Sequence, residues 1–288
     1  MGNEQEAGRR VECQAELESI LAAAPDILWS VEILDVAAQC SLASWEPGRQ
    51  LKTASVAKVF LLVEVAARLE EGSLLEEEPL DRRGVARVED SGLWRHLRVN
   101  ELPLVDTALL VAAVSDNWAT NALLDRVGLP AVQERGRALG YSESRLEDYV
   151  RDVRGPDVPP TISLGRADDW AEMFARLHRR RLHSPAVDSR VEQWLRAGVD
   201  LSMVASAFRL DPLAHASAVG SFQTFNKTGT DEGVRADAGV VVGARPLAYC
   251  AIANWSPESD CTDAAMDGMH AIGRLIRYSL KDVQQVHA

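Results

Sequence analysis

The chain has 288 residues, a hydrophobic content of 47% and a formal net charge of −12 at pH 7, with an isoelectric point near 5.0. The acidic balance argues against a surface for nucleic acid or an anionic membrane, and no apolar run is long enough for a transmembrane helix. The apolar content suffices for a sizeable core, in one large domain or two intertwined subdomains.

The first quarter of the sequence predicts a helix, two strands and a buried helix. Apolar residues recur at helical spacing over residues 11–23, and residues 27–36 and 41–45 have the composition of paired strands. Residues 56–69 are apolar on nearly every face, which is typical of a central helix. No basic segment followed by an apolar stretch marks a secretory leader, so we expect a cytoplasmic location.

The middle of the chain predicts a block of helices. Asp106 is the expected N-cap of a helix over residues 107–114, and Ser163 is the expected N-cap of a later helix. Residues 142–160 contain a glycine, three prolines and many charges without a period, and loops of this length are often functional. Further helices are expected over residues 118–127, 129–139 and 191–195.

The last part of the chain predicts strands followed by a terminal amphipathic helix. The strands are expected over residues 222–226, 238–242 and 247–253, and the helix over residues 263–280. Strands from both ends of the chain can join in one antiparallel sheet of five strands, faced by the first and last helices. The fold class is therefore α/β in the α+β sense, with residues 1–52 and 218–288 as a sheet subdomain and residues 53–217 as an inserted, all-helical subdomain.

A serine and a lysine stand one helical turn apart at the start of the predicted buried helix. The chain has only four lysines among its 31 basic residues, and Lys58 follows Ser55 by three positions. A desolvated lysine can give up its proton whereas arginine cannot, so Lys58 is a candidate base and Ser55 a candidate nucleophile. For this pair alone, the alternative is a serine N-cap beside a lysine that reaches solvent.

Two further motifs share this chemistry. A Ser-Asp-Asn motif at residues 115–117 interrupts a predicted helix, and a Lys-Thr-Gly motif at residues 227–229 follows a predicted strand. All three motifs in this order are expected by chance in roughly one chain in ten thousand. Together they are the motifs of class A β-lactamases and penicillin-binding proteins. From about residue 27 to residue 280, the chain resembles the class A β-lactamase-related serine hydrolases.

The resemblance implies a β-lactamase-like fold, with an acyl-enzyme formed at Ser55 in the cleft between the subdomains. The N–H groups of Ser55 and Thr230 would form the oxyanion hole, and Arg235 would bind a substrate carboxylate, unless it is a plain surface residue. The implied catalytic residues are Ser55, Lys58, Ser115 and Lys227, and the implied substrate-binding residues are Asn117, Thr228, Thr230 and Arg235.

One part of the family pattern is missing. Residues 145–147 match the start of the loop that carries a deacylating glutamate in class A β-lactamases, but Val150 stands where that glutamate is expected. Glu147, Asp148 and Asp152 are the acids that could take its place. We therefore predict slow deacylation of β-lactam adducts.

The sequence thus predicts a serine hydrolase that acts on β-lactam, amide or ester carbonyls of a small molecule. If Arg235 has the role that the resemblance implies, this molecule carries a carboxylate. No cofactor or metal is expected, because the cysteines and histidines lack metal-ligand spacing. Nucleic acid and membranes are not expected as partners. The alternatives are an esterase or acyl-transfer enzyme in the biosynthesis of a small metabolite, and a protein that binds β-lactams without turnover. A cell-wall peptidase is disfavoured because no leader is visible.

Overall fold

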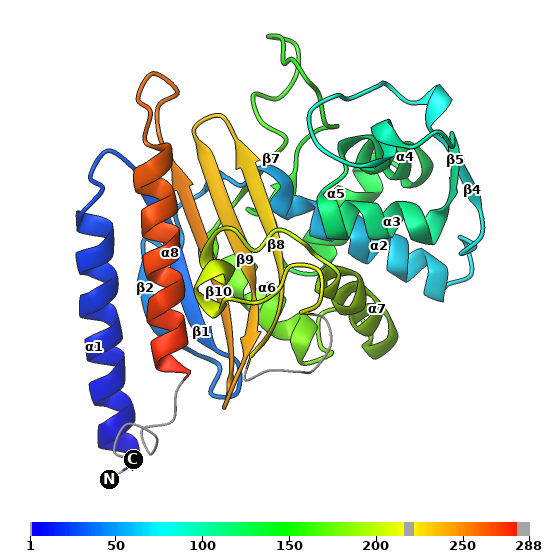
Figure 1. The fold of residues 1–288 in the computed structure, drawn as a ribbon. Coiled ribbons are helices and arrows are strands. Elements are labelled where there is room, and N and C mark those ends of the chain that lie inside the picture. Colours follow the sequence, from blue (N-terminus) through cyan, green and yellow to red (C-terminus); the bar gives the residue numbers. More distant parts are fainter. Residues whose placement is uncertain (1, 216–221, 281–288) are drawn as a thin grey trace.

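The centre of the molecule is one antiparallel sheet of five strands (Figure 1). The computed structural model describes residues 2–215 and 222–280. The strands are β1 (Leu28–Asp35), β2 (Cys40–Trp45), β8 (Gln223–Asp231), β9 (Val234–Val242) and β10 (Pro246–Asn254). Their order is β2-β1-β10-β9-β8, so strands from both ends of the chain lie side by side. The predicted five-stranded antiparallel sheet is confirmed.

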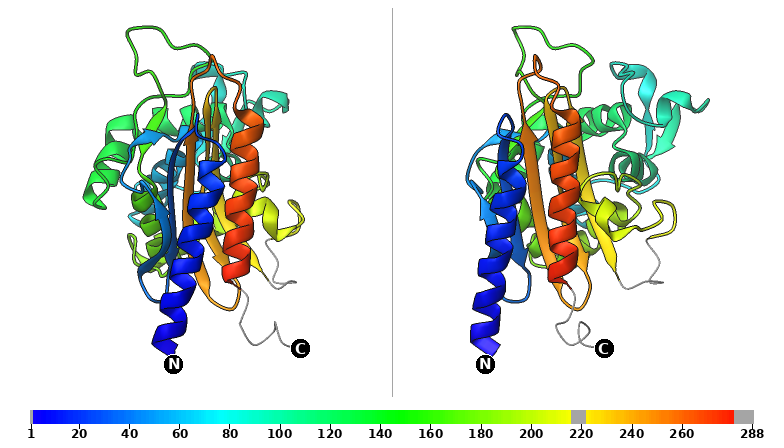
Figure 2. Two further views of the ribbon diagram at one scale, coloured as in Figure 1. Left: turned by 90° about the vertical axis from the view of Figure 1, so that its left-hand side faces the viewer. Right: turned by 60° about the vertical axis from the view of Figure 1, so that its left-hand side comes forward.

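Two terminal helices cover one face of this sheet. Helices α1 (Gly2–Ala22) and α8 (Thr262–Ser279) lie side by side there (Figures 1 and 2). Helix α8 is amphipathic and buries Met269 and Ile272 in the same apolar cluster as Trp29 of β1. The flanking of the sheet by the first and last helices is therefore as predicted.

The opposite face of the sheet carries helix α6 (Ala167–His178), with a block of helices beyond it. At the centre of this block is α2 (Lys58–Glu70), in which every residue from Lys58 to Ala67 is buried. Helix α2 has no polar face and therefore needs neighbours on all sides. Those neighbours are α3 (Leu104–Val114), α4 (Asn117–Val127), α5 (Leu129–Ala138) and α7 (Pro185–Arg196).

Short strands and 3₁₀ turns connect the helices. The short strands are β3 (Leu51–Lys52), β7 (Ser163–Gly165) and β6 (Arg145–Leu146), paired in that order, and β4 (Pro79–Asp81), paired with β5 (Glu101–Pro103). The 3₁₀ turns are η1 (Ala54–Ala57), η2 (Arg82–Gly84), η3 (Trp94–His96) and η4 (Val204–Phe208). The inserted block is thus helical in its main elements, with small sheets at its margins.

Three local predictions are wrong. Asp106 lies in the first turn of α3, and the N-cap is Pro103, which tolerates this position because the start of a helix leaves N–H groups unpaired. Ser163 lies in a strand rather than at a helix cap, because pairing with β3 and β6 extends this segment. The strand predicted over residues 222–226 ends too early, because β9 pairs with β8 as far as Asp231, and the Lys-Thr-Gly motif therefore lies within this edge strand.

The division into subdomains stays a prediction, and its second boundary, between residues 217 and 218, lies outside the described residues. Within residues 2–215 and 222–280, no helix is both long and apolar enough to cross a lipid bilayer. In the same described ranges, His, Cys, Asp and Glu side chains form no group of three or more that could hold a metal ion.

Candidate active site

Ser55 lies in a tight turn whose backbone is held by a neighbouring strand. It is the second residue of η1, and Lys58 is the first residue of α2. Ala54 has a φ of 45°, in the left-handed region that costs a non-glycine residue about 1–2 kcal/mol. From β7, Ser163 Oγ donates to Ala54 O over 2.6 Å and shares a 2.7 Å hydrogen bond with Thr53 Oγ1. Hydrogen bonds from Ser163 in β7 therefore help to hold the turn that presents Ser55.

Lys58 is fully buried against the Ser-Asp-Asn motif. Its Nζ donates to Ser115 O and to Asn117 Oδ1, each at 2.7 Å, and lies 3.2 Å from Ser115 Oγ. Burial and, after it, the positive charge of Lys227 hold the pKa of Lys58 well below its ordinary value, although two nearby carboxylates act in the opposite sense. The site therefore favours the neutral amine of Lys58 more than water does.

The Ser-Asp-Asn motif breaks the chain between two helices, as predicted. Ser115 has a φ of 56°, so α3 ends there and α4 begins at Asn117. The Asp116 carboxylate accepts one hydrogen bond from the first turn of α4 and two, of 2.7 Å each, from the N–H groups of Leu93 and Trp94. Asp116 thus caps α4 and ties the preceding loop to the motif.

The Lys-Thr-Gly motif lies on the edge strand β8, directly beside the Ser55 turn. A Cβ atom on Gly229 would stand 2.1 Å from Thr53 O and 3.0 Å from Ser55 N. Both distances are shorter than ordinary contacts, so glycine allows the strand to approach the turn. This approach brings the backbone of β8 to the N–H group of the candidate nucleophile.

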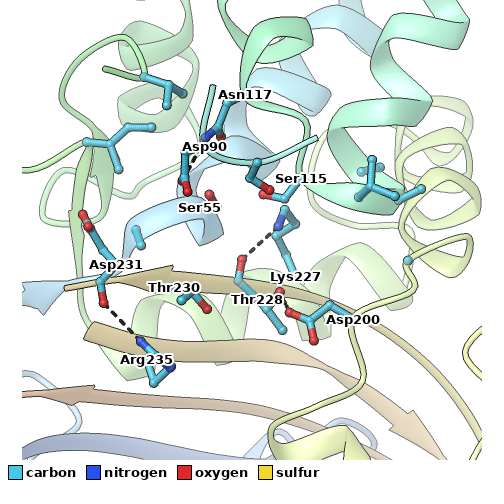
Figure 3. Close-up of a pocket in the computed structure, with 18 of the residues that line it drawn as sticks. Ser55, Asp90, Ser115, Asn117, Asp200, Lys227, Thr228, Thr230, Asp231 and Arg235 are labelled. Carbon is cyan, nitrogen blue, oxygen red and sulfur yellow. Dashed lines mark hydrogen bonds between the residues drawn. The ribbon is translucent and has the colours of Figure 1, made fainter. Parts of the chain in front are cut away.

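Lys227 extends from β8 toward Ser115 (Figure 3). Its Nζ donates to Thr228 O at 2.8 Å. Burial lowers the pKa of Lys227 to about 8, against the opposing effect of two carboxylates. At neutral pH Lys227 is therefore mainly an ammonium.

A cavity of about 1030 Å³ lies between β8 and the helical block (Figure 3). The predicted residues that line it are Ser55, Ser115, Asn117, Lys227, Thr228, Thr230 and Arg235. Lys58 lies behind this lining, in contact with Ser115 and Asn117. The structure therefore brings every predicted site residue either to the cavity wall or directly behind it.

Arg235 lies at the hairpin end of the cavity, on β9 opposite Thr230. Its Nη1 donates to Asp231 O at 3.1 Å and to Val234 O at 2.8 Å. Its guanidinium carbon lies 5.7 Å from the ring centroid of Trp255, within the range of a cation–π contact. The guanidinium is thus held in one orientation at the cavity rim.

The loop between β6 and β7 brings an apolar residue to the cavity where the family pattern has a glutamate. Val150 lines the cavity, and Asn121 clamps its backbone N–H and C=O through two hydrogen bonds of 2.9 Å. Glu147 is paired with an arginine at 2.6 Å, and two arginines hold the buried carboxylate of Asp148. Of the three acids proposed as substitutes, Asp152 is the one that lines the cavity.

Sequence analysis missed the clamp at Ser163 and five acidic residues of the lining, of which two contact predicted site residues; the five are Glu89, Asp90, Asp200, Asp231 and Glu232. Asp90 accepts a long hydrogen bond of 3.4 Å from Asn117 Nδ2, and Asp200 accepts one of 2.7 Å from Thr228 Oγ1. Both acids belong to segments without a period, so no local pattern marks them. Their place in the site arises from tertiary contacts alone.

Comparisons with known proteins agree with this geometry. A sequence profile of the beta-lactamase enzyme family matches residues 12–279, whereas no curated protein sequence matches the chain. The structure is similar to a β-lactamase from Sphaerobacter thermophilus, with a TM-score of 0.79 and 22% identity over 92% of this chain and 97% of that one. It is also similar to a mutant of PBP-A in an acyl-enzyme complex with penicillin G (TM-score 0.78, 17% identity, 93% and 96% covered). A β-lactamase from Xanthomonas campestris is a third similar structure (TM-score 0.77, 17% identity, 94% and 98% covered).

These low identities show a shared fold, whereas the profile match extends over most of the chain. The chain belongs to the beta-lactamase enzyme family.

Proposed function

We propose that the protein is a serine hydrolase that accepts the acyl group of a β-lactam, amide or ester on Ser55 and releases β-lactam products slowly. The observation that carries this proposal is the fully buried Lys58 beside the ammonium of Lys227, which favours a neutral amine three residues from the serine. Family membership by itself supports a β-lactamase-like serine hydrolase, without the details of acylation and release.

The contacts of Lys58 hold its amino group beside the Ser-Asp-Asn motif. Nζ donates two short hydrogen bonds, to Ser115 O and Asn117 Oδ1, and a longer one of 3.2 Å to Ser115 Oγ. A neutral amine has two N–H donors and one lone pair. It can keep the two short bonds and offer the lone pair to a hydroxyl proton, so Lys58 is the proposed base for Ser55.

Acylation then proceeds in two steps, attack by Ser55 and departure of the leaving atom. Ser55 Oγ bonds to the substrate carbonyl carbon while its proton passes to Lys58, and the carbonyl oxygen becomes an oxyanion that the N–H groups of Ser55 and Thr230 would stabilise. The bond to the leaving nitrogen or oxygen breaks as that atom takes, through Ser115 and beside the ammonium of Lys227, the proton that Lys58 had accepted. The products are neutral Lys58, an ester at Ser55 and a protonated leaving atom, which departs from an amide or ester but stays attached to the acyl group of an opened β-lactam.

Release of the acyl group needs a water that loses its proton as it attacks the ester. Val150 cannot take that proton, and the Asp148 carboxylate is engaged by two arginines. A long-lived adduct is therefore proposed for penicillins, as in the acyl-enzyme complex of the PBP-A mutant with penicillin G. Small acyl groups leave more room for water, and Lys58 could activate it.

At saturating penicillin G, hydrolysis should show a burst of one equivalent per protein and then a slow steady state. The reason is the missing base, because a lost general base slows a step by roughly 10²–10⁴. Intact-mass spectrometry during the steady state should show a single penicillin adduct, and p-nitrophenyl acetate should turn over faster than penicillin. Linear, burst-free penicillin hydrolysis at about 10 per second or more would contradict slow deacylation and would point to Asp152 as the base.

An esterase or acyl-transfer enzyme for a small metabolite is the second candidate. The carboxylate of Asp200 beside Thr228 favours this candidate. A negative charge there repels anionic ligands such as penicillins, whereas it does not repel neutral esters. The same experiment separates the candidates, since turnover of small esters without a penicillin adduct fits the esterase. A penicillin adduct without turnover of either substrate fits a β-lactam-binding protein.

The Arg235→Ala variant should bind carboxylated ligands more weakly, by about 1.5–3 kcal/mol, because a hydrogen bond to a charged group is lost. Neutral esters should be unaffected. Competition for acylation by a neutral ester would measure both affinities, with Arg98→Ala, on an exposed loop, as the matched control. Equal losses for charged and neutral ligands would instead show that Arg235 has a structural role.

A further inference from the structure

The hydroxyl of Thr228 is already engaged as a donor. Thr228 Oγ1 donates its single proton to Asp200 Oδ2 at 2.7 Å, and both residues line the cavity. A hydroxyl that has given its proton to a carboxylate can offer only lone pairs to a ligand. At this point of β8 the cavity therefore presents acceptors, a negative charge and no free hydroxyl proton.

The Asp200 carboxylate is held in place as an anion. Its Oδ1 accepts hydrogen bonds from Ser202 N at 3.1 Å and from Ser202 Oγ at 2.6 Å, and its Oδ2 accepts the Thr228 bond. Burial raises the pKa of Asp200, but these hydrogen bonds and the nearby charge of Lys227 outweigh it and lower the pKa below the ordinary value. Asp200 is therefore charged at every pH at which the protein would be assayed.

The position of Asp200 relative to Ser55 indicates which part of a substrate meets it. Ser115 and Lys227 carry the protons that a leaving atom needs, so the leaving group lies on their side of the scissile bond. In Figure 3, Asp200 lies toward the Lys227 end of the labelled stretch of β8, and Arg235 lies toward the opposite end. Asp200 therefore lies on the side of the leaving group.

We propose that Asp200 determines specificity on the leaving-group side of the cavity, favouring cationic leaving groups and rejecting those with a carboxylate. This inference rests on the proposed acylation of Ser55 and adds to it the charge class of the substrate. The bond from Thr228 to Asp200 is its basis, because it places a fixed anion where Lys227 would otherwise attract a carboxylate. Penicillins carry a carboxylate on the ring of their leaving nitrogen, so they should need high concentrations to acylate Ser55.

A series of three acetate esters with the same acyl group tests the charge preference. The leaving phenols carry a meta trimethylammoniomethyl, methyl or carboxylate group, and each rate is divided by the rate of hydroxide hydrolysis to remove intrinsic reactivity. In wild-type protein at low salt, the corrected kcat/KM for the cationic ester should exceed that for the anionic ester by about a hundredfold. The ratio should shrink at high salt, because ions screen an exposed charge pair.

The Asp200→Asn variant keeps the size of the side chain and removes its charge, so it should lower the ratio to about threefold or less. Asp26→Asn, at an exposed position in the turn between α1 and β1, is the matched control and should keep the wild-type ratio. Should Asp200→Asn fail to fold, the wild-type ratio and its salt dependence still test the inference.

Three results would overturn the inference. If the three esters acylate Ser55 at equal corrected rates, the preference is absent although the proposed function stands. If the ratio is large but Asp200→Asn retains it, another charge is responsible. The absence of an acetyl adduct with every ester would overturn the proposed function, and this inference with it.

Discussion

The Ser55→Ala variant should take up no acyl group from any β-lactam or activated ester. The reason is that Ser55 lines the cavity at the point where β8 approaches within contact of its N–H group, and Lys58, the proposed base, is buried behind that wall. Removing the nucleophile removes the covalent step itself rather than one contribution to it. Wild-type protein should gain the acyl mass once, on the peptide that contains residue 55, and the variant should not gain it.

The Ser142→Ala variant is the matched control, because Ser142 is an exposed serine outside the cavity lining. It should acquire the adduct at the wild-type rate. An unchanged adduct in Ser55→Ala would refute the assignment of the nucleophile, and mapping of the modified peptide would then identify the true acceptor.

The Lys58→Arg variant should lose acylation by at least about a hundredfold, since proton transfer by a positioned base contributes roughly 10²–10⁴. Lys58 is fully buried between Ser115 and Asn117, and an arginine there cannot release its proton. Because a guanidinium is larger than an ammonium, Lys58→Met provides a second variant that fills the same space without a charge. Both should be compared with wild type by pre-steady-state acylation, with thermal unfolding as the check on folding.

The pH dependence of acylation identifies the two lysines separately. The reaction needs neutral Lys58 and charged Lys227, so the wild-type rate should fall as pH rises through about 8, where Lys227 loses its proton. As pH falls, the rate should decrease only well below the ordinary pKa of lysine, where Lys58 becomes charged. Lys58→Met should lose this acidic limb, and retained neutral-pH rates in both variants would show that Lys58 is not the base.

The sequence predicted the sheet, its flanking helices and most site residues because these have local signatures. Helical spacing marked α8, and the motifs at residues 55–58, 115–117 and 227–229 marked both walls of the cavity. The Lys-Thr-Gly motif also contains a residue that the packing requires, because only glycine at position 229 lets the strand contact the Ser55 turn.

The errors arise where tertiary pairing determines the conformation. Ser163 has the composition of a helix cap, but β3 and β6 pair with its segment and draw it into a strand. Asp200 has no local signature at all, because its role depends on Thr228, which lies 28 residues further along the chain. The missing glutamate at Val150 was visible in the sequence, whereas the pairing of Asp148 with two arginines was not.

The left-handed backbone at Ala54 links the chemistry of the site to the assembly of the whole molecule. The hydroxyl of Ser163 and the close contact of Gly229 with Thr53 hold that turn, and they come from distant parts of the chain. The turn has a hydrogen bond of its own, from Val56 N to Thr53 O at 3.1 Å, but the strained backbone at Ala54 also depends on these outside contacts. The proposed nucleophile therefore takes this alignment from strands that must first dock against the turn, so its reactivity should appear together with the complete fold.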